Sequence, residues 1–232
     1  MRQIRCQLRT GIPIARVLLK KKCYLVQETM YRYSDDMKKA REPTYIFVVL
    51  TLVLIVVNTV LAYASTTYIP SNASGIVYLF PAVAFMILFT LWYGLYGAIA
   101  AYVGTLVGSG LLATEVLAQN PAIAVIWAGA GLIQVLIPLI AVRKFGIDLA
   151  LPERRDISLI ILFAVVLNNL VGAAWGAFTL GLVVDTPGAA GSVFFGWLIG
   201  NVIVTLLVVP LALRFITPRI EKSRLFVKAY WD

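Results

Sequence analysis

Residues 43 to 114 read PTYIFVVLTLVLIVVNTVLAYASTTYIPSNASGIVYLFPAVAFMILFTLWYGLYGAIAAYVGTLVGSGLLAT and contain no charged side chain. A membrane-spanning helix needs about 20 consecutive, mostly apolar residues, because the hydrocarbon core of a bilayer is about 30 Å thick. The stretch is long enough for more than one such helix, so we expect lipid to surround this part of the chain.

The composition of the whole chain has the same character. Of its 232 residues 61% are hydrophobic and 13% charged, whereas soluble domains carry about 25% charged residues. The net charge of +9 would also fit a nucleic-acid-binding protein. However, all 20 Lys and Arg residues lie in three segments beside the apolar stretches, at 1–42, 143–155 and 214–228. Such flanks are typical of cytoplasmic loops, so we expect a lipid bilayer as the partner and no nucleic acid.

Polar and turn-forming segments divide the apolar sequence into six predicted helices. Residues 76 to 114 would reach about 58 Å as one helix, at 1.5 Å per residue, so they must form a hairpin. Its turn is predicted at residues 92 to 97, where two glycines break the helix and three aromatic side chains favour the membrane interface. The other predicted helices are residues 45–64, 121–142, 157–182 and 192–213.

Six helices leave every basic segment on one side of the membrane. Because cytoplasmic loops are enriched in Lys and Arg, both termini are predicted to be cytoplasmic. The expected fold is an all-α membrane protein with six transmembrane helices in one bundle, multi-pass in the cell membrane. Its parts are a basic cytoplasmic N-terminal extension (1–42), the transmembrane domain (43–214) and a basic cytoplasmic tail (215–232).

The N-terminal extension has two interpretations. Its apolar run at residues 12 to 19 is interrupted by Pro13 and Arg16 and is followed by three lysines, which does not fit a signal peptide. The extension is either a basic amphipathic helix on anionic lipid or a solvated, disordered segment. Cys6 and Cys23 are expected to stay reduced in the cytoplasm and, in a chain without histidine, to bind no metal.

Small residues recur at helical spacing within the predicted spans. Such spacing places them on one helix face and lets a second helix backbone approach closely. The expected helix-packing residues are Gly97, Ala101, Gly104, Gly108, Gly172, Gly176, Gly196 and Gly200. Packing inside the bundle is the favoured interpretation, and an interface with another protein is the alternative.

Amide side chains at membrane depth are the candidate ligand-binding groups. An amide in hydrocarbon needs a hydrogen-bond partner, so it points into the bundle or into a cavity. The deep polar residues are Asn58, Gln134, Asn168, Asn169, Asn201 and Thr205, with Trp127, Trp175 and Trp197 as neighbouring walls. We expect an uncharged ligand at Asn168, Asn169, Asn201, Gln134, Trp175 and Trp197. The alternative is that the amides only join helices to one another.

The chemistry that is missing from the spans is equally informative. None of the predicted helices contains Asp, Glu, Lys, Arg or His, so no general acid or base, proton relay or charged ion site is expected at depth. The sequence also contains no phosphate-binding loop. We therefore expect a protein that is not an enzyme and has no cofactor and no metal.

Several short motifs between residues 76 and 214 carry a resemblance to a known family. They are Tyr78-Leu79-Phe80-Pro81-Ala82, Trp92-Tyr93-Gly94, Val142-Arg143-Lys144-Phe145-Gly146, Arg154-Arg155-Asp156, Trp197-Leu198-Ile199-Gly200-Asn201 and Val209-Pro210-Leu211. This part of the chain resembles the MASE-type integral membrane sensor domains of bacterial receptors. The resemblance implies a non-enzymatic sensor that binds a small molecule or partner and relays the signal to a separate cytoplasmic protein.

Two other functions remain open. Residues 92 to 112 are also similar to the substrate-binding membrane components of energy-coupling-factor vitamin transporters, which have six helices and no catalytic domain. The first predicted helix lacks the pair of alanines, four residues apart, with which those components dock. The third possibility is a scaffold subunit of a larger membrane complex, in which the glycine faces contact other proteins.

Overall fold

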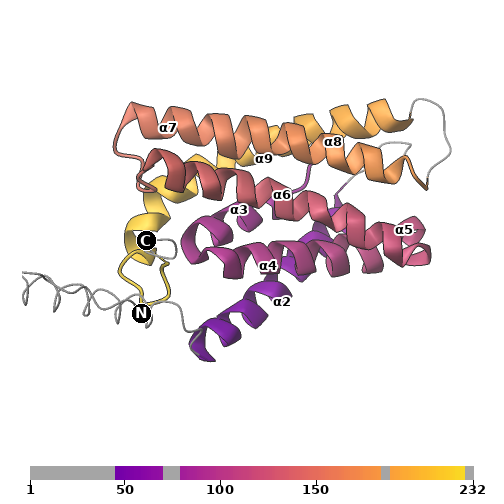
Figure 1. Ribbon diagram of the computed structural model, residues 1–232, viewed down its shortest axis with the longest axis horizontal. Coiled ribbons are helices and arrows are strands. Elements are labelled where there is room, and N and C mark those ends of the chain that lie inside the picture. Colours follow the sequence, from indigo (N-terminus) through magenta and orange to yellow (C-terminus); the bar gives the residue numbers. More distant parts are fainter. Residues whose placement is uncertain (1–44, 70–78, 184–188, 228–232) are drawn as a thin grey trace, which may run out of the picture. The chain divides into compact units, whose positions relative to one another are not determined.

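The computed structural model describes residues 45–69, 79–183 and 189–227 (Figure 1). All regular elements in these ranges are helical. They are α2 (Tyr45–Tyr68), α3 (Ala82–Tyr93), α4 (Leu95–Gly104), the π-helix η1 (Thr105–Leu112), α5 (Glu115–Gln119), α6 (Pro121–Phe145), α7 (Arg154–Ile160), the π-helix η2 (Ile161–Leu167), α8 (Asn168–Leu180) and α9 (Ala189–Ile220). The predictions made for the N-terminal extension, including Cys6 and Cys23, lie outside the described residues.

Five of the helices are long and apolar enough to cross a bilayer. They are α2, the continuous α4–η1 helix, α6, the continuous α7–η2–α8 helix and α9. The all-helical class and the multi-pass membrane character predicted from the sequence are thus confirmed. The remaining apolar helix, α3, has 12 residues and rises about 18 Å, which is less than the roughly 30 Å of a bilayer core.

Helix α3 is short because glycine and proline delimit it. Gly94 has φ 61° and ψ −136°, a conformation that is strained for any residue with a Cβ atom, and it separates α3 from α4 inside the predicted 92–97 turn. Pro81 stands at the other end of α3. Residues 76 to 114 were predicted to form two membrane-spanning helices. The first of them is shorter than predicted, because regular helix begins only at Ala82.

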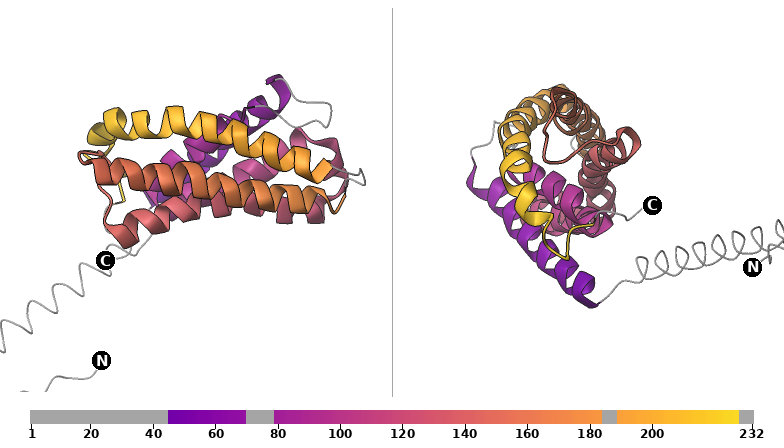
Figure 2. Two further views of the ribbon diagram at one scale, coloured as in Figure 1. Left: turned by 90° about the horizontal axis from the view of Figure 1, so that it is seen from above. Right: turned by 90° about the vertical axis from the view of Figure 1, so that its left-hand side faces the viewer.

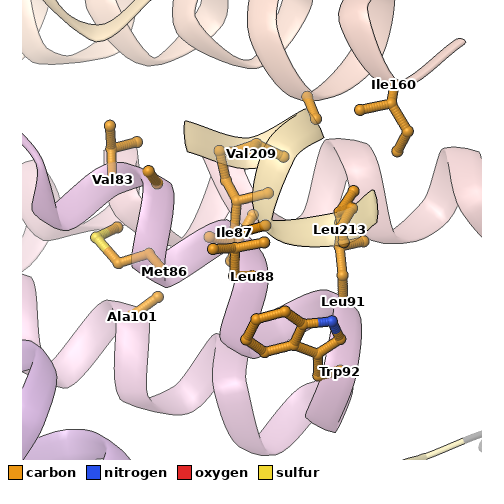
Figure 3. Close-up of a cluster of buried hydrophobic side chains, with 14 of the residues drawn as sticks. Val83, Met86, Ile87, Leu88, Leu91, Trp92, Ala101, Ile160, Val209 and Leu213 are labelled. Atoms are coloured by element: carbon orange, nitrogen blue, oxygen red, sulfur yellow. The ribbon is translucent and has the colours of Figure 1, made fainter. Parts of the chain in front are cut away.

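Helix α3 forms the centre of the core. Most of α3 is buried between α2, α4, α6 and α9, which suits a helix that is apolar on all sides. Met86, Ile87, Leu88, Leu91 and Trp92 of α3 belong to one buried cluster that also contains residues of α6, α7 and α9 (Figure 3).

Several predicted helix ends differ from those in the structure. Helix α2 continues past residue 64 to Tyr68, and the hydroxyls of Ser65 and Thr66 are satisfied inside it by the carbonyls four residues earlier. The helix predicted from residue 157 begins at Arg154. Helix α9 runs to Ile220, past the end predicted at residue 213, and contains Pro210 and Pro218 without ending at either.

The long helices lie lengthwise in a bundle, and their connections gather at two ends. The α7–η2–α8 helix and α9 run side by side, while α2 crosses the bundle obliquely (Figures 1 and 2). One end carries the α3–α4 turn, the α6–α7 loop and the end of α9 (Figure 1). The basic residues that the structure describes all belong to this end: Arg143, Lys144, Arg154, Arg155, Arg214, Arg219, Lys222 and Arg224.

Candidate functional site

Polar side chains lie at the same depth in all of the long helices. Asn58 lies near the middle of α2, Thr105 near the middle of α4–η1, and Gln134 near the middle of α6. Asn168 and Asn169 lie near the middle of α7–η2–α8, and Asn201 and Thr205 near that of α9. All seven are buried. The interior of the bundle therefore has a polar layer halfway along its length.

Gln134, Asn169 and Thr205 join three helices in one network. The Gln134 amide Nε2 donates to Oδ1 of Asn169 over 3.0 Å, which links α6 to α8. The Asn169 amide Nδ2 donates to Oγ1 of Thr205 over 2.8 Å, which links α8 to α9, and to the carbonyl of Val165 over 2.7 Å. The Thr205 hydroxyl donates to the carbonyl of Asn201 over 2.7 Å. The three side chains therefore hold one another in fixed orientations.

A glycine makes room for this network. A Cβ atom at Gly172 would overlap the Cγ and Cδ atoms of Gln134. Gly172 lies on α8, three residues after Asn169. The space beside Gly172 and the hydrogen-bond partner of Gln134 are therefore on the same face of the helix. This explains why the long Gln134 side chain fits between two closely packed helices.

Two further asparagines of the polar layer, Asn168 and Asn201, have unused hydrogen-bonding atoms. Asn168 is fully buried, and neither its Oδ1 nor its Nδ2 has a partner among the described residues. The Nδ2 atom of Asn201 is buried and also lacks one. Leaving a buried polar group unpaired costs about 1–3 kcal/mol. We call Gln134, Asn168, Asn169, Asn201 and Thr205 the central amide cluster. It has spare donors and a spare acceptor, and all of its members are uncharged.

The predicted tryptophans occupy different places. Trp197 lies against Gly176, where a Cβ atom would overlap its ring, and its ring centroid is 5.8 Å from that of Trp127. The buried Nε1 of Trp127 has no partner among the described residues. Trp175 instead donates from Nε1 to the carbonyl of Ile126 over 2.8 Å, at an exposed position between α8 and α6. The structure therefore places Trp197 one helical turn from Asn201, whereas the Trp175 indole is bonded to α6 at Ile126.

The glycines of α4–η1 contact other helices of the same chain. A Cβ atom at Gly97 would overlap the α3 backbone at Phe89, and one at Gly104 or Gly108 would overlap Asn58 or Thr59 of α2. Asn58 also donates from Nδ2 to the carbonyl of Ala101 over 3.4 Å. Gly196 is half-buried and Gly200 is buried in α9. At Gly97, Gly104, Gly108, Gly172 and Gly176 the space beside the glycine is thus already filled from within.

A π-helix immediately precedes the asparagine pair. The backbone N–H of Asn168 donates to the carbonyl of Phe163, five residues earlier, at the end of η2. The wider turn rotates the residues that follow it relative to those before it, and π-turns inside α-helices are frequent at functional sites. The local backbone thus sets the face on which Asn168 and Asn169 lie.

Some contacts between helices carry no signal in the sequence. Gly131 on α6 packs against Thr105 and Met86, and Thr217 accepts a hydrogen bond from Trp92 over 3.0 Å. A glycine or threonine inside an apolar helix is common, so only the contact across helices reveals these roles. The unpaired state of Asn168 is likewise invisible in the sequence, where Asn168 and Asn169 look equivalent.

Comparison of the chain with protein-family models, with curated proteins and with solved structures finds no match. The chemistry of the central amide cluster is therefore the basis for assigning a function.

Proposed function

We propose that this protein is a non-enzymatic receptor in the cell membrane, with six passages through the bilayer and both ends in the cytoplasm. The grouping of all described basic residues at one end of the bundle supports this orientation. In this topology α3 lies in the second passage.

The ligand is a small uncharged molecule bound at the central amide cluster. The observation that carries this proposal is the pair of unpaired amide atoms on the fully buried Asn168. A ligand with one hydrogen-bond donor and one acceptor would satisfy both atoms, while the bonded Asn169 holds the neighbouring helices in place. No ionisable side chain lies between residues 116 and 142, 157 and 184, or 186 and 213, so a charged ligand would have no counterion there. The same absence of acids and bases supports a role without catalysis.

Binding would be relayed through α9 to a separate cytoplasmic protein. Thr205 of the cluster lies on α9, and the same helix extends to Ile220 at the basic end. A ligand that changes the packing of Asn201 or Thr205 would therefore act on the helix that reaches the cytoplasm.

Replacement of Asn168 by leucine tests the proposal. Wild-type protein and the Asn168→Leu variant would be purified from native membranes into lipid nanodiscs, and the small molecules that accompany each would be identified by mass spectrometry. We expect the variant to insert and fold but to lose a molecule that accompanies the wild type. Thr179→Val is the matched control, because the buried Thr179 hydroxyl bonds only to carbonyls of its own helix. If Asn168→Leu keeps the same molecules as the control, Asn168 is not a ligand-binding residue.

A transporter component is the second candidate, and the short helix α3 favours it. Helices that begin part-way across the bilayer are typical of substrate sites in transporters. The energy-coupling-factor alternative predicts that an ATPase pair and a membrane coupling protein accompany the chain in the same purification. The scaffold alternative gains less support, because the space beside Gly97, Gly104, Gly108, Gly172 and Gly176 is filled by the chain itself.

A further inference from the structure

A buried stripe on α9 connects the central amide cluster with the basic end of the bundle. Thr205, Val209, Leu213 and Thr217 follow one another at four-residue spacing, and each is fully buried. Thr205 accepts a hydrogen bond from Asn169 of the cluster. Val209 and Leu213 belong to the buried cluster formed around α3 (Figure 3). We call these four residues the α9 stripe.

The far end of the stripe is bonded to Trp92, the last buried residue of α3. The Trp92 indole Nε1 donates to the hydroxyl of Thr217 over 3.0 Å, and both residues are buried. A second bond uses the backbone of the same residue, because the N–H of Val227 donates to the Trp92 carbonyl over 3.0 Å. Trp92 therefore contacts both α9 and the chain that follows α9.

The segment that follows α9 folds back onto the bundle. A turn after Ile220 is closed by the bond from the Ser223 N–H to the Ile220 carbonyl, over 2.9 Å. Ile220 and Phe226 pack against the buried cluster. This docked segment, residues 221 to 227, includes the exposed basic residues Lys222 and Arg224. The Val227 bond joins the backbone of this segment to α3.

We propose that Trp92 is a latch for the docked segment and that the central amide cluster controls this latch. Displacement of the α9 stripe at Thr205 moves Thr217 away from the Trp92 indole, Trp92 shifts, and its carbonyl loses the Val227 N–H. The segment then leaves the bundle, and the partly buried residues 225 to 227 become accessible to a cytoplasmic partner together with the basic residues beside them. The proposal rests on the proposed function, because it supplies the step between an occupied cluster and a response outside the membrane.

Hydrogen exchange of the docked segment in nanodiscs tests the latch. Thr217→Val removes the acceptor of the Trp92 indole but keeps the size of the side chain. We expect about a ten-fold faster exchange of the Val227 amide, corresponding to one lost buried hydrogen bond. Val227→Pro is the second variant, since it removes the N–H itself without changing the bundle. It should expose residues 221 to 226 to the same degree, and an unchanged exchange in both variants would overturn the latch.

Control by the cluster is tested without a ligand. Thr205→Val removes the hydroxyl that receives the Asn169 bond, and it should speed exchange of the docked segment by at least about three-fold if the two places are coupled. Trp175→Phe is the control, because it removes one hydrogen bond between helices away from the stripe and should leave the segment unchanged. Equal exchange in these two variants would refute the coupling. That result would not contradict ligand binding. Binding is tested by a different measurement, the identification of the small molecules that accompany Asn168→Leu.

Discussion

Substitution of Gly172 by alanine gives a direct test of the central amide cluster. The new Cβ atom would overlap the Gln134 side chain, so Gln134 must move away from Asn169. Overpacking of a core costs about 1–3 kcal/mol and the lost hydrogen bond about 0.5–1.5 kcal/mol. Replacing glycine by alanine inside a helix by itself stabilises the folded protein by about 0.5–1 kcal/mol. We therefore expect a net loss of about 2 kcal/mol of unfolding free energy.

The loss can be measured by equilibrium unfolding in mixed micelles as the fraction of denaturing detergent rises. Gly129→Ala is the matched control on α6, because its nearest neighbour, Nε1 of Trp175, would be 3.5 Å from the new Cβ atom. That distance is an ordinary contact, so the control should be as stable as the wild type or slightly more stable. In a Gln134→Ala background, Gly172→Ala should cost almost nothing more, since the overlapping side chain is gone. A Gly172→Ala protein as stable as the Gly129→Ala control would refute the packing described for Gln134.

Three further predictions concern other contacts of the bundle. Gly176→Ala should displace the Trp197 ring, lower the unfolding free energy by about 1–3 kcal/mol, and weaken the near-ultraviolet circular dichroism of the tryptophans. In the same unfolding assay Asn169→Leu should destabilise the protein by about 2–4 kcal/mol, whereas Asn168→Leu should be neutral or stabilising by about 1–3 kcal/mol, because only Asn169 has partners to lose. Arg214→Leu should speed limited proteolysis of the α6–α7 loop, whose carbonyls accept two bonds from its guanidinium, and an unchanged cleavage rate would exclude that contact as a restraint.

The sequence predicted well those features that depend on residues within a single helix. The glycines at residues 94 and 97 predicted the break between two helices, and Gly94 forms it. The deep amides were recognised because polar residues are rare in an apolar run. The helix ends were predicted less well, because Ser65 and Thr66 are turn-forming by composition but bond to their own helix in the structure.

The candidate site depends on contacts between helices that are distant in the sequence. Asn168 and Asn169 are equivalent neighbours in the sequence, yet only Asn169 reaches Gln134 and Thr205. Trp175 and Trp197 looked like two walls of one pocket, but Trp175 bonds to Ile126 at an exposed position. No periodicity within a single helix distinguishes these cases, because each depends on which face of a second helix lies opposite.

Helical structure and membrane embedding could be predicted from the amino acids alone, because apolar length and the placement of charge are properties of each segment. Tertiary structure decided which amides are bonded and which are spare, how far α3 extends, and how α9 meets Trp92. The physical reason is that hydrogen bonds and close packing between helices act over a few ångströms, so they exist only after distant segments have been brought together.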